Sequence, residues 1–349
     1  MKRNVKRVFI IDDSRISREI IKKAIEERED LIFAGEAEDP YEARERIIGA
    51  RPDVVTLDIQ MPKMDGITFL KHLMKQYPLP VVVISGNPHR VFEAMDAGAV
   101  DFVAKPKIQT REELQDFLET MIDTIRGAVY ATVNKHPKAR ESGVDSEGKR
   151  IHPGEKTGKG RISLIAIGAS TGGTETVLSI LKQFPREMPP IVVVQHMPPV
   201  FTRSYARRLD EHCEINVKEG EHGEFLQRGY AYIAPGGKMM RVDKQDNRPV
   251  LKISNEDKIS GHIPSVDGLF YSITTMPGLA GKTIGVILTG MGYDGAKGLL
   301  ELRRRKAHTI GQDEKSSIIY GMPRAAFTIG AVAEQLPVEK IAKAIYNRI

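Results

Sequence analysis

The sequence predicts an α/β protein with two domains, each built on a parallel sheet. Apolar runs of four to six residues alternate with amphipathic stretches in both halves of the 349-residue chain. Parallel strands need crossover helices, so this alternation is typical of a sheet that is covered on both faces. The stretch Asn134–Arg161 separates the halves and holds eight Lys or Arg, four Asp or Glu and almost no large apolar residue. We therefore expect domains at 1–129 and 161–349, joined by a flexible linker at 130–160.

The N-terminal half is expected to form a five-stranded parallel sheet. Between its strands lie stretches with helical periodicity, such as Ile16–Glu27, whose apolar side chains recur on one face. The right-handed crossover rule leaves few topologies for such a chain. The expected strands are Val8–Ile11, Leu31–Ala34, Val54–Leu57, Val81–Ile84 and Val100–Val103.

The C-terminal half is expected to be a doubly wound, mostly parallel α/β domain that carries antiparallel hairpins. Its buried parallel strands are predicted at Ile162–Ile167, Ile191–Val194 and Thr283–Leu288. Four shorter runs lie among Gly and Pro turns, which favours antiparallel pairing. These four runs are Glu214–Val217, Ala231–Ile233, Met239–Val242 and Val250–Ile253.

Composition excludes several classes of protein. The only cysteine, Cys213, excludes a disulfide framework and a cysteine zinc site, and favours a reduced, cytoplasmic setting. The longest apolar runs are far shorter than the roughly 20 residues of a membrane helix, and the N-terminus does not fit a signal peptide. The net charge is +6, of which the linker carries +4 without an aromatic residue for base stacking. We expect no membrane insertion and no nucleic-acid binding.

Polar residues gather where the N-terminal strands are expected to end. Asp12 and Asp13 follow the first strand, Asp58 the third, Ser85 the fourth and Lys105 the fifth. A single aspartate at the end of a strand is most simply explained as a helix N-cap. Five polar groups at one edge of the sheet instead indicate a ligand site. Three carboxylates need a hard cation, and Mg²⁺ suits them. The set therefore predicts phosphoryl transfer to one aspartate.

The segments "FIIDDS", "VVTLDIQMPKMDG", "VVVISGNP" and "DFVAKP" resemble the response-regulator receiver domain, from about Lys6 to Val129. The resemblance implies a flavodoxin-like fold with Asp58 as phospho-acceptor and with Asp12, Asp13 and Asp58 as the Mg²⁺ site. It also assigns the switch residues, which are Ser85, Phe102 and Lys105.

A serine follows the first strand of the C-terminal half. The turn Gly168–Gly173 fits G-x-S-x-G, in which a strained strand–turn–helix exposes the hydroxyl, here that of Ser170. The alternative is a dinucleotide-binding turn, which needs an acidic residue at the end of the next strand. That strand ends instead in Gln195 and His196, so a base stands where the ribose carboxylate is required.

The other histidines show no catalytic pattern, and His212, His222 and His262 show no metal-ligand spacing such as H-E-x-x-H. His196 differs because it is expected one strand away from Ser170, at the same sheet edge. Asp294, after the strand Thr283–Leu288, can orient its imidazole. Asp313 is a competing orienting acid, and the sequence favours Asp294 only slightly.

The segments "IGASTGG", "VVVQHMPP", "AYIAPGG", "VILTGMGYDGA" and "DEKSSIIYGMPRAA" resemble the catalytic domain of the CheB family of chemotaxis protein-glutamate methylesterases. The resemblance covers about Ile162 to Ile349. It implies Ser170 as nucleophile, His196 as general base and Asp294 as its orienting acid. It also implies that the backbone N–H of Met291 holds the oxyanion, with Thr171 beside the nucleophile.

Together, the two resemblances imply a phosphorylation-regulated hydrolase. It would remove methyl groups from glutamate esters on chemoreceptors and deamidate receptor glutamines, with a chemotaxis histidine kinase as phosphodonor. The unphosphorylated receiver would block the catalytic face. Mg²⁺ would serve the receiver, and no cofactor is expected for the esterase. The alternative is a receiver-regulated binding module with a nucleotide or DNA output, for which no helix-turn-helix or winged-helix segment is found.

Overall fold

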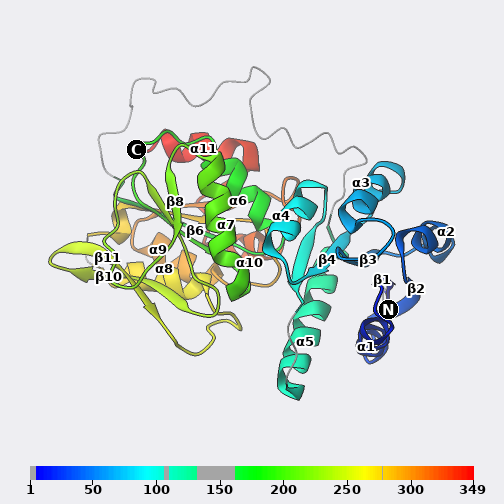
Figure 1. Ribbon diagram of the computed structural model, residues 1–349. Coiled ribbons are helices and arrows are strands. Elements are labelled where there is room, and N and C mark those ends of the chain that lie inside the picture. Colours follow the sequence, from blue (N-terminus) through cyan, green and yellow to red (C-terminus); the bar gives the residue numbers. More distant parts are fainter. Residues whose placement is uncertain (1–4, 106–109, 132–161, 277) are drawn as a thin grey trace. The chain divides into compact units, whose positions relative to one another are not determined.

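The computed structural model describes residues 5–105, 110–131, 162–276 and 278–349. The chain divides into two compact units, Met1–Ala139 and Arg140–Ile349, which we describe separately (Figure 1). The predicted linker lies almost wholly outside the described residues, so its limits stay predictions. None of the helices in the described ranges has both the length and the apolar character to span a bilayer.

The first unit holds the five-stranded parallel sheet that the sequence predicts, in the order β2-β1-β3-β4-β5. Its strands are β1 (Lys6–Ile11), β2 (Leu31–Ala37), β3 (Val54–Asp58), β4 (Val81–Ser85) and β5 (Asp101–Ala104). Its helices are α1 (Arg15–Glu26), α2 (Pro40–Ala50), α3 (Gly66–Gln76), α4 (Pro88–Asp96) and α5 (Arg111–Ala128). β1, β3 and β4 are almost wholly buried at their carboxyl ends, as expected for a sheet covered on both faces.

Short polar side chains begin the helices of this unit. Each accepts a hydrogen bond from a backbone N–H of the first helical turn, which would otherwise have no partner. In α5 the cap is a full capping box, because Glu113 also reaches back to the backbone of Thr110. The caps of α1 to α4 are Ser14, Asp39, Asp65 and Asn87.

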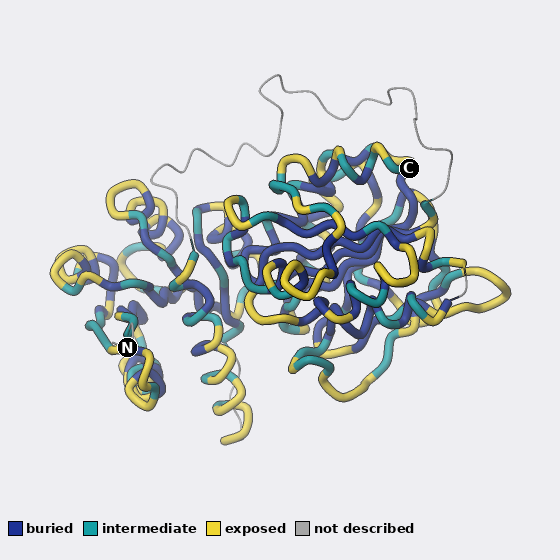
Figure 2. Tube along the Cα trace, turned by 180° about the vertical axis from the view of Figure 1, so that it is seen from behind, coloured by how far each residue is buried: buried dark blue, intermediate teal, exposed yellow. Residues whose placement is uncertain are grey.

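The second unit is built on a seven-stranded sheet in the order β14-β13-β12-β6-β7-β9-β8, with every pair parallel. Figure 2 shows the buried strands that form its core. The strands are β6 (Leu164–Ala169), β7 (Ile191–Gln195), β8 (Asn216–Glu219), β9 (Tyr230–Ile233), β12 (Thr283–Ile287), β13 (His308–Gln312) and β14 (Glu334–Leu336).

Two groups of helices cover this sheet, which confirms the doubly wound prediction. Helices α6 (Gly173–Leu181), α7 (Pro199–His212) and α11 (Val338–Tyr346) form one group, in which α6 contacts the other two. Helices α8 (Val266–Thr274), α9 (Ala296–Arg304) and α10 (Met322–Thr328) form the other, around α9 (Figure 1).

The antiparallel hairpin is confirmed for two of the four short runs and is wrong for the other two. Strands β10 (Met239–Gln245) and β11 (Arg248–Ser254) pair antiparallel in a sheet of their own. In contrast, β8 and β9 extend the main sheet in parallel. Two neighbouring strands can run parallel only if the chain returns to the edge of the sheet where the first strand began. The loop between β8 and β9 is long enough for this return, whereas a two-residue turn is not.

Each sheet has a switch point, where the connections on either side run in opposite directions. It lies between β1 and β3 in the first unit and between β6 and β12 in the second. In open parallel sheets, ligands bind beyond the carboxyl ends of the strands that flank this point. The topology therefore places one candidate site in each unit, at the strand ends that the sequence marks.

Candidate active site and acidic cluster

Ser170 lies in a sharp turn between β6 and α6. Gly172 makes this turn possible, because its φ is +74° and an added Cβ would lie 2.6 Å from the Ile318 side chain. The Ser170 N–H donates to the Thr289 carbonyl at 3.0 Å, and the Ser170 carbonyl accepts from the Gly173 N–H at 2.7 Å. The turn is thus fixed on both sides, while Ser170 itself stays partly exposed.

His196 lies one strand away, directly after β7. Its N–H donates to the carbonyl of Ala169, the residue before Ser170, at 3.1 Å. Its Nε2 lies 2.9 Å from Oδ2 of Asp294. Its Nδ1 is buried and has no hydrogen-bond partner within the described residues. The free nitrogen of the ring is therefore Nδ1, and a base that takes a proton from Ser170 must use it.

Asp294 is almost wholly buried, yet its carboxylate accepts several hydrogen bonds. Besides His196, it accepts from the Ser265 hydroxyl at 2.8 Å and from the N–H groups of Val266 and Asp267 at 2.7 and 3.0 Å. These donors are the cap and first turn of α8, where the helix dipole favours an anion. Burial raises the pKa of Asp294, but the bonds from His196 and the two N–H groups outweigh it and hold the pKa below its usual value.

The competing acid, Asp313, has a different position. Its carboxylate accepts from the N–H and the hydroxyl of Ser316, at 3.0 and 2.6 Å, and so caps the turn that follows β13. Asp294 is therefore the acid that contacts His196.

The peptide between Gly290 and Met291 packs against the nucleophile. A Cβ added to Gly290 would lie 2.6 Å from the Cβ of Ser170. The Gly290 carbonyl accepts from the N–H groups of Gly321 and Met322, at 3.1 and 2.8 Å. Because a trans peptide directs its N–H opposite to its carbonyl, the Met291 N–H points away from these donors. Within the described residues it donates to no backbone carbonyl.

Thr171, the residue after the nucleophile, is buried, and its carbonyl accepts from the Thr289 hydroxyl at 3.0 Å. The Thr171 N–H, like that of Met291, has no backbone acceptor in the described part of the chain. Two N–H groups that find no backbone acceptor among the described residues therefore flank Ser170 at the sheet's switch point.

The structure adds His262, a residue to which no sequence pattern assigns a role. Its ring stacks on that of His196, with centroids 3.9 Å apart and planes 13° from parallel. Burial, reinforced by the neighbouring His196, lowers the pKa of His262 to about 4. Its loop is distant in sequence from the other site residues, and no spacing signals the contact.

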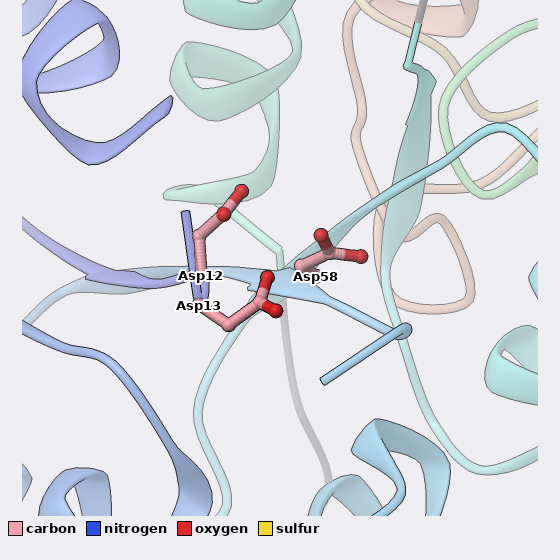
Figure 3. A group of neighbouring side chains, drawn as sticks. All are labelled: Asp12, Asp13 and Asp58. Atoms are coloured by element: carbon pink, nitrogen blue, oxygen red, sulfur yellow. The ribbon is translucent and has the colours of Figure 1, made fainter. Parts of the chain in front are cut away.

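In the first unit, Asp12, Asp13 and Asp58 come together as predicted (Figure 3). Each offers a carboxylate oxygen within 4.8 Å of the others, at the ends of β1 and β3. The Lys105 Nζ lies 2.5 Å from Oδ2 of Asp58 and 3.4 Å from Oδ2 of Asp12. The lysine thus offsets part of the charge that the three acids concentrate.

The surroundings of Asp58 hold it firmly. Its Oδ1 accepts from the Gln60 N–H at 2.9 Å. Burial raises the pKa of Asp58 above its usual value, although the bonds from Lys105 and Gln60 act in the opposite direction. Ser85 is buried at the end of β4, next to β3, and Phe102 is buried against the ring of Phe92.

This acidic cluster is compatible with Mg²⁺, because it offers hard oxygen ligands and only one lysine against three carboxylates. Asp12 is further oriented by the Ser17 hydroxyl at 2.7 Å and the Ser14 N–H at 2.9 Å.

Comparison with protein families settles what kind of chain carries these two sites. Residues 8–119 match the family model of the response regulator receiver domain. Residues 165–345, more than half of the chain, match the model of the CheB methylesterase. The chain belongs to the CheB methylesterase family. Both candidate sites fall inside the matched ranges, the acidic cluster within 8–119 and the Ser170 site within 165–345.

Curated relatives match the chain along almost its whole length. The chain is 41% identical over 98% of its length to a protein-glutamate methylesterase/protein-glutamine glutaminase of Syntrophomonas wolfei, covering 97% of that protein. It is 43% identical over 98% of its length to a protein of the same name from Cupriavidus pinatubonensis, covering 96% of it. The crystal structure of the Thermotoga maritima CheB methylesterase catalytic domain is 36% identical and covers 54% of this chain and 99% of that one, with a TM-score of 0.52.

Proposed function

We propose that this CheB family member hydrolyses glutamate methyl esters on chemoreceptors and deamidates receptor glutamines. It does so in the cytoplasm, under the control of phosphorylation at Asp58 by a chemotaxis histidine kinase. The observation that carries the proposal is the contact of His196 with Asp294 beside the Ser170 turn. A nucleotide-binding output is disfavoured, because β7 ends in an amide, Gln195, and a base, His196, follows it where a ribose carboxylate is needed.

In the first half-reaction, the Ser170 hydroxyl oxygen attacks the ester carbonyl while Nδ1 of His196 takes its proton. Asp294 holds the other proton of the imidazolium on Nε2 and stabilises its charge. The tetrahedral oxyanion forms beside the N–H groups of Met291 and Thr171, neither of which bonds a backbone carbonyl in the described part of the chain. The intermediate collapses to an acyl-enzyme, and methanol leaves with the proton from His196.

In the second half-reaction, water attacks the acyl-enzyme and His196 takes its proton by the same nitrogen. Collapse releases glutamate and returns the proton to Ser170. Glutamine follows the same route, with ammonia as the leaving group.

The acidic cluster performs the regulatory reaction. Asp58 accepts the phosphoryl group, which adds roughly −1.5 to −2 charge. Bound Mg²⁺, held by Asp12, Asp13 and Asp58, would supply charge neutralisation at the phosphoryl oxygens. Lys105, which follows β5 at the same edge of the sheet, stabilises the same oxygens, and the Ser85 hydroxyl and Phe102 respond to the modified Asp58.

The test measures methanol release from a methylated chemoreceptor by the full chain and by Ser170→Ala, each with and without a small phosphodonor and Mg²⁺. We expect release by the wild-type protein, stimulation by the phosphodonor, and a loss of about 10⁴-fold or more in Ser170→Ala. Equal rates in the two proteins would contradict the serine mechanism. Release without stimulation would contradict the regulation alone.

A further inference from the structure

One side chain bonds the backbones of both the nucleophile and the base. Gln195, the last residue of β7, is 3% exposed. Its Nε2 donates to the Ser170 carbonyl at 2.9 Å and to the His196 carbonyl at 3.1 Å. A primary amide has two N–H donors, so both bonds form at once. The distance between the Ser170 turn and the His196 loop is therefore bridged by a single planar group.

The amide holds this orientation at a cost. Its Oε1 is buried and accepts no hydrogen bond within the described residues. The reverse orientation would place Oε1 against the carbonyl oxygens of Ser170 and His196, where acceptors repel each other. A buried acceptor without a partner is unfavourable and calls for an explanation.

Gly173 makes room for the amide. A Cβ added at this position would lie 2.2 Å from Oε1 of Gln195 and 2.7 Å from the Cβ of Ala169. The backbone of Gly173 is helical, so the approach of Oε1, and not a positive φ, disfavours a side chain here. The helix that follows the nucleophile and the amide thus fit against each other.

We infer that Gln195 is a positioning residue, which fixes His196 relative to Ser170 through its two hydrogen bonds. Both of its donors bond backbone carbonyls, and neither bonds the Ser170 hydroxyl or the His196 ring. The inference rests on the proposed function, since it assumes that Ser170 and His196 react together. Reacting atoms that are misplaced by about 1 Å can lose about 100-fold in rate, so a tether of this kind controls kcat rather than substrate binding.

Two variants separate hydrogen bonding from packing. Gln195→Met keeps similar volume but removes both donors, and Gln195→Glu keeps the shape but places oxygen at the donor position. The matched control is Gln183→Met, because Gln183, two residues after α6, also donates to a backbone carbonyl, that of Ser179, at 2.8 Å. Rates of methanol release from methylated receptor give kcat and KM for the full chain with phosphodonor and Mg²⁺. A fluorophosphonate reports the reactivity of Ser170 directly, and thermal melting reports folding.

We expect both Gln195 variants to lose about 100-fold in kcat and in the fluorophosphonate rate, with KM within about threefold of wild type and Gln183→Met unchanged. A purely structural role predicts a folded Gln195→Met with the wild-type kcat, and this result would overturn the inference. If Gln195→Met does not fold, Gly173→Ala provides the test instead. This variant retains Gln195, but its added Cβ displaces Oε1 of that side chain. Wild-type kcat in a folded Gly173→Ala then overturns the inference, and a lowered kcat with unchanged KM supports it.

Ser170→Ala in the same experiment separates this inference from the proposed function. If it retains methanol release, the proposed function fails. If it loses release while the Gln195 variants keep the wild-type kcat, only the role of Gln195 fails.

Discussion

His196 contacts Asp294 through Nε2, and the two atoms Nε2 and Oδ2 lie 2.9 Å apart. In the serine-protease triad the nitrogens have the opposite roles, because Nδ1 faces the aspartate and Nε2 faces the serine. Here an ionised Asp294 keeps the proton on Nε2 and leaves the buried Nδ1 as the acceptor. The same three residue types thus assemble with the imidazole turned round.

The first prediction concerns this assignment of nitrogens. Asp294→Asn removes the charge that stabilises the imidazolium and favours the wrong tautomer of His196. It also presents an amide N–H to donors such as the Val266 N–H. We expect kcat for methanol release to fall by about 10³ to 10⁴. Labelling His196 with ¹⁵N provides the check, since NMR should show the proton on Nε2 in the wild-type protein.

The control for this prediction is Asp267→Asn. Asp267 is a buried carboxyl at the same helix start, and it accepts from the Ser260 hydroxyl and the Gly298 N–H. We expect it to keep kcat within a few fold of wild type. Equal losses of kcat in both variants would mean that any disturbance at the start of α8 inactivates the protein.

A second prediction follows from the turn at Gly172. Gly172→Ala places a side chain at φ +74° and 2.6 Å from Ile318, so both strain and a clash result. The left-handed backbone alone costs about 1–2 kcal/mol. We expect a larger loss in the free energy of unfolding and a strong fall in kcat. Urea unfolding and methanol release measure the two effects.

Gly223→Ala isolates the strain in that prediction. Gly223 has φ +80°, and an added Cβ would find no heavy atom within 4 Å. Gly223→Ala should therefore lower the free energy of unfolding only by the cost of the left-handed backbone, and it should leave kcat unchanged. A Gly172→Ala protein as stable and active as Gly223→Ala would show that the Ile318 contact relaxes freely.

Much of this architecture is readable from the sequence because it depends on local pattern. The strand ends of a parallel sheet meet at one edge, so Asp12 and Asp58 could be placed together without coordinates. The same rule brought Ser170 and His196 to one edge. The functional roles of these residues remain predictions, which the experiments above test.

Other features depend on tertiary contacts that leave no local trace. Short runs among glycine turns resemble hairpins, so antiparallel pairing was predicted for the segments of β8 and β9. In the structure, β9 instead pairs in parallel with β7, and β8 pairs in parallel with β9. The stack of His262 on His196 joins residues that are 66 positions apart in the sequence. No periodicity connects such residues.

The third prediction concerns the stability of the first unit. Burial raises the pKa of Asp58 above its value in the unfolded chain, so its charged form is less favourable in the folded state. For an acid with a raised pKa, stability increases as the pH falls through that pKa, and the charge lowers stability at pH 7. Asp58→Asn should therefore raise the free energy of unfolding at pH 7 while it abolishes phosphorylation. Urea unfolding and phosphodonor labelling measure these two changes.

Asp39→Ala is the comparison variant, for which we expect the opposite change in the free energy of unfolding. The Lys63 ammonium and the N–H groups of Glu42 and Tyr41 lower the pKa of Asp39, which caps α2. Its loss should lower the free energy of unfolding at pH 7 and leave phosphorylation intact. Destabilisation by Asp58→Asn as well would contradict the view that Asp58 is retained for function at the expense of stability.

The last prediction uses the pH dependence of His262. Burial first, and then the neighbouring His196, lower its pKa to about 4, whereas the unfolded value is near 6.5. The unfolded chain thus binds the proton more readily, and this histidine removes stability progressively as the pH falls from 6.5 towards 4. The groups that act on it are His196, Asp294 and Lys258. His262→Phe keeps an aromatic ring over His196 and cannot take up a proton. Urea unfolding at pH 7 and pH 5 should therefore show a smaller loss of stability in His262→Phe than in wild type, and equal losses would mean that His262 titrates normally in the folded protein.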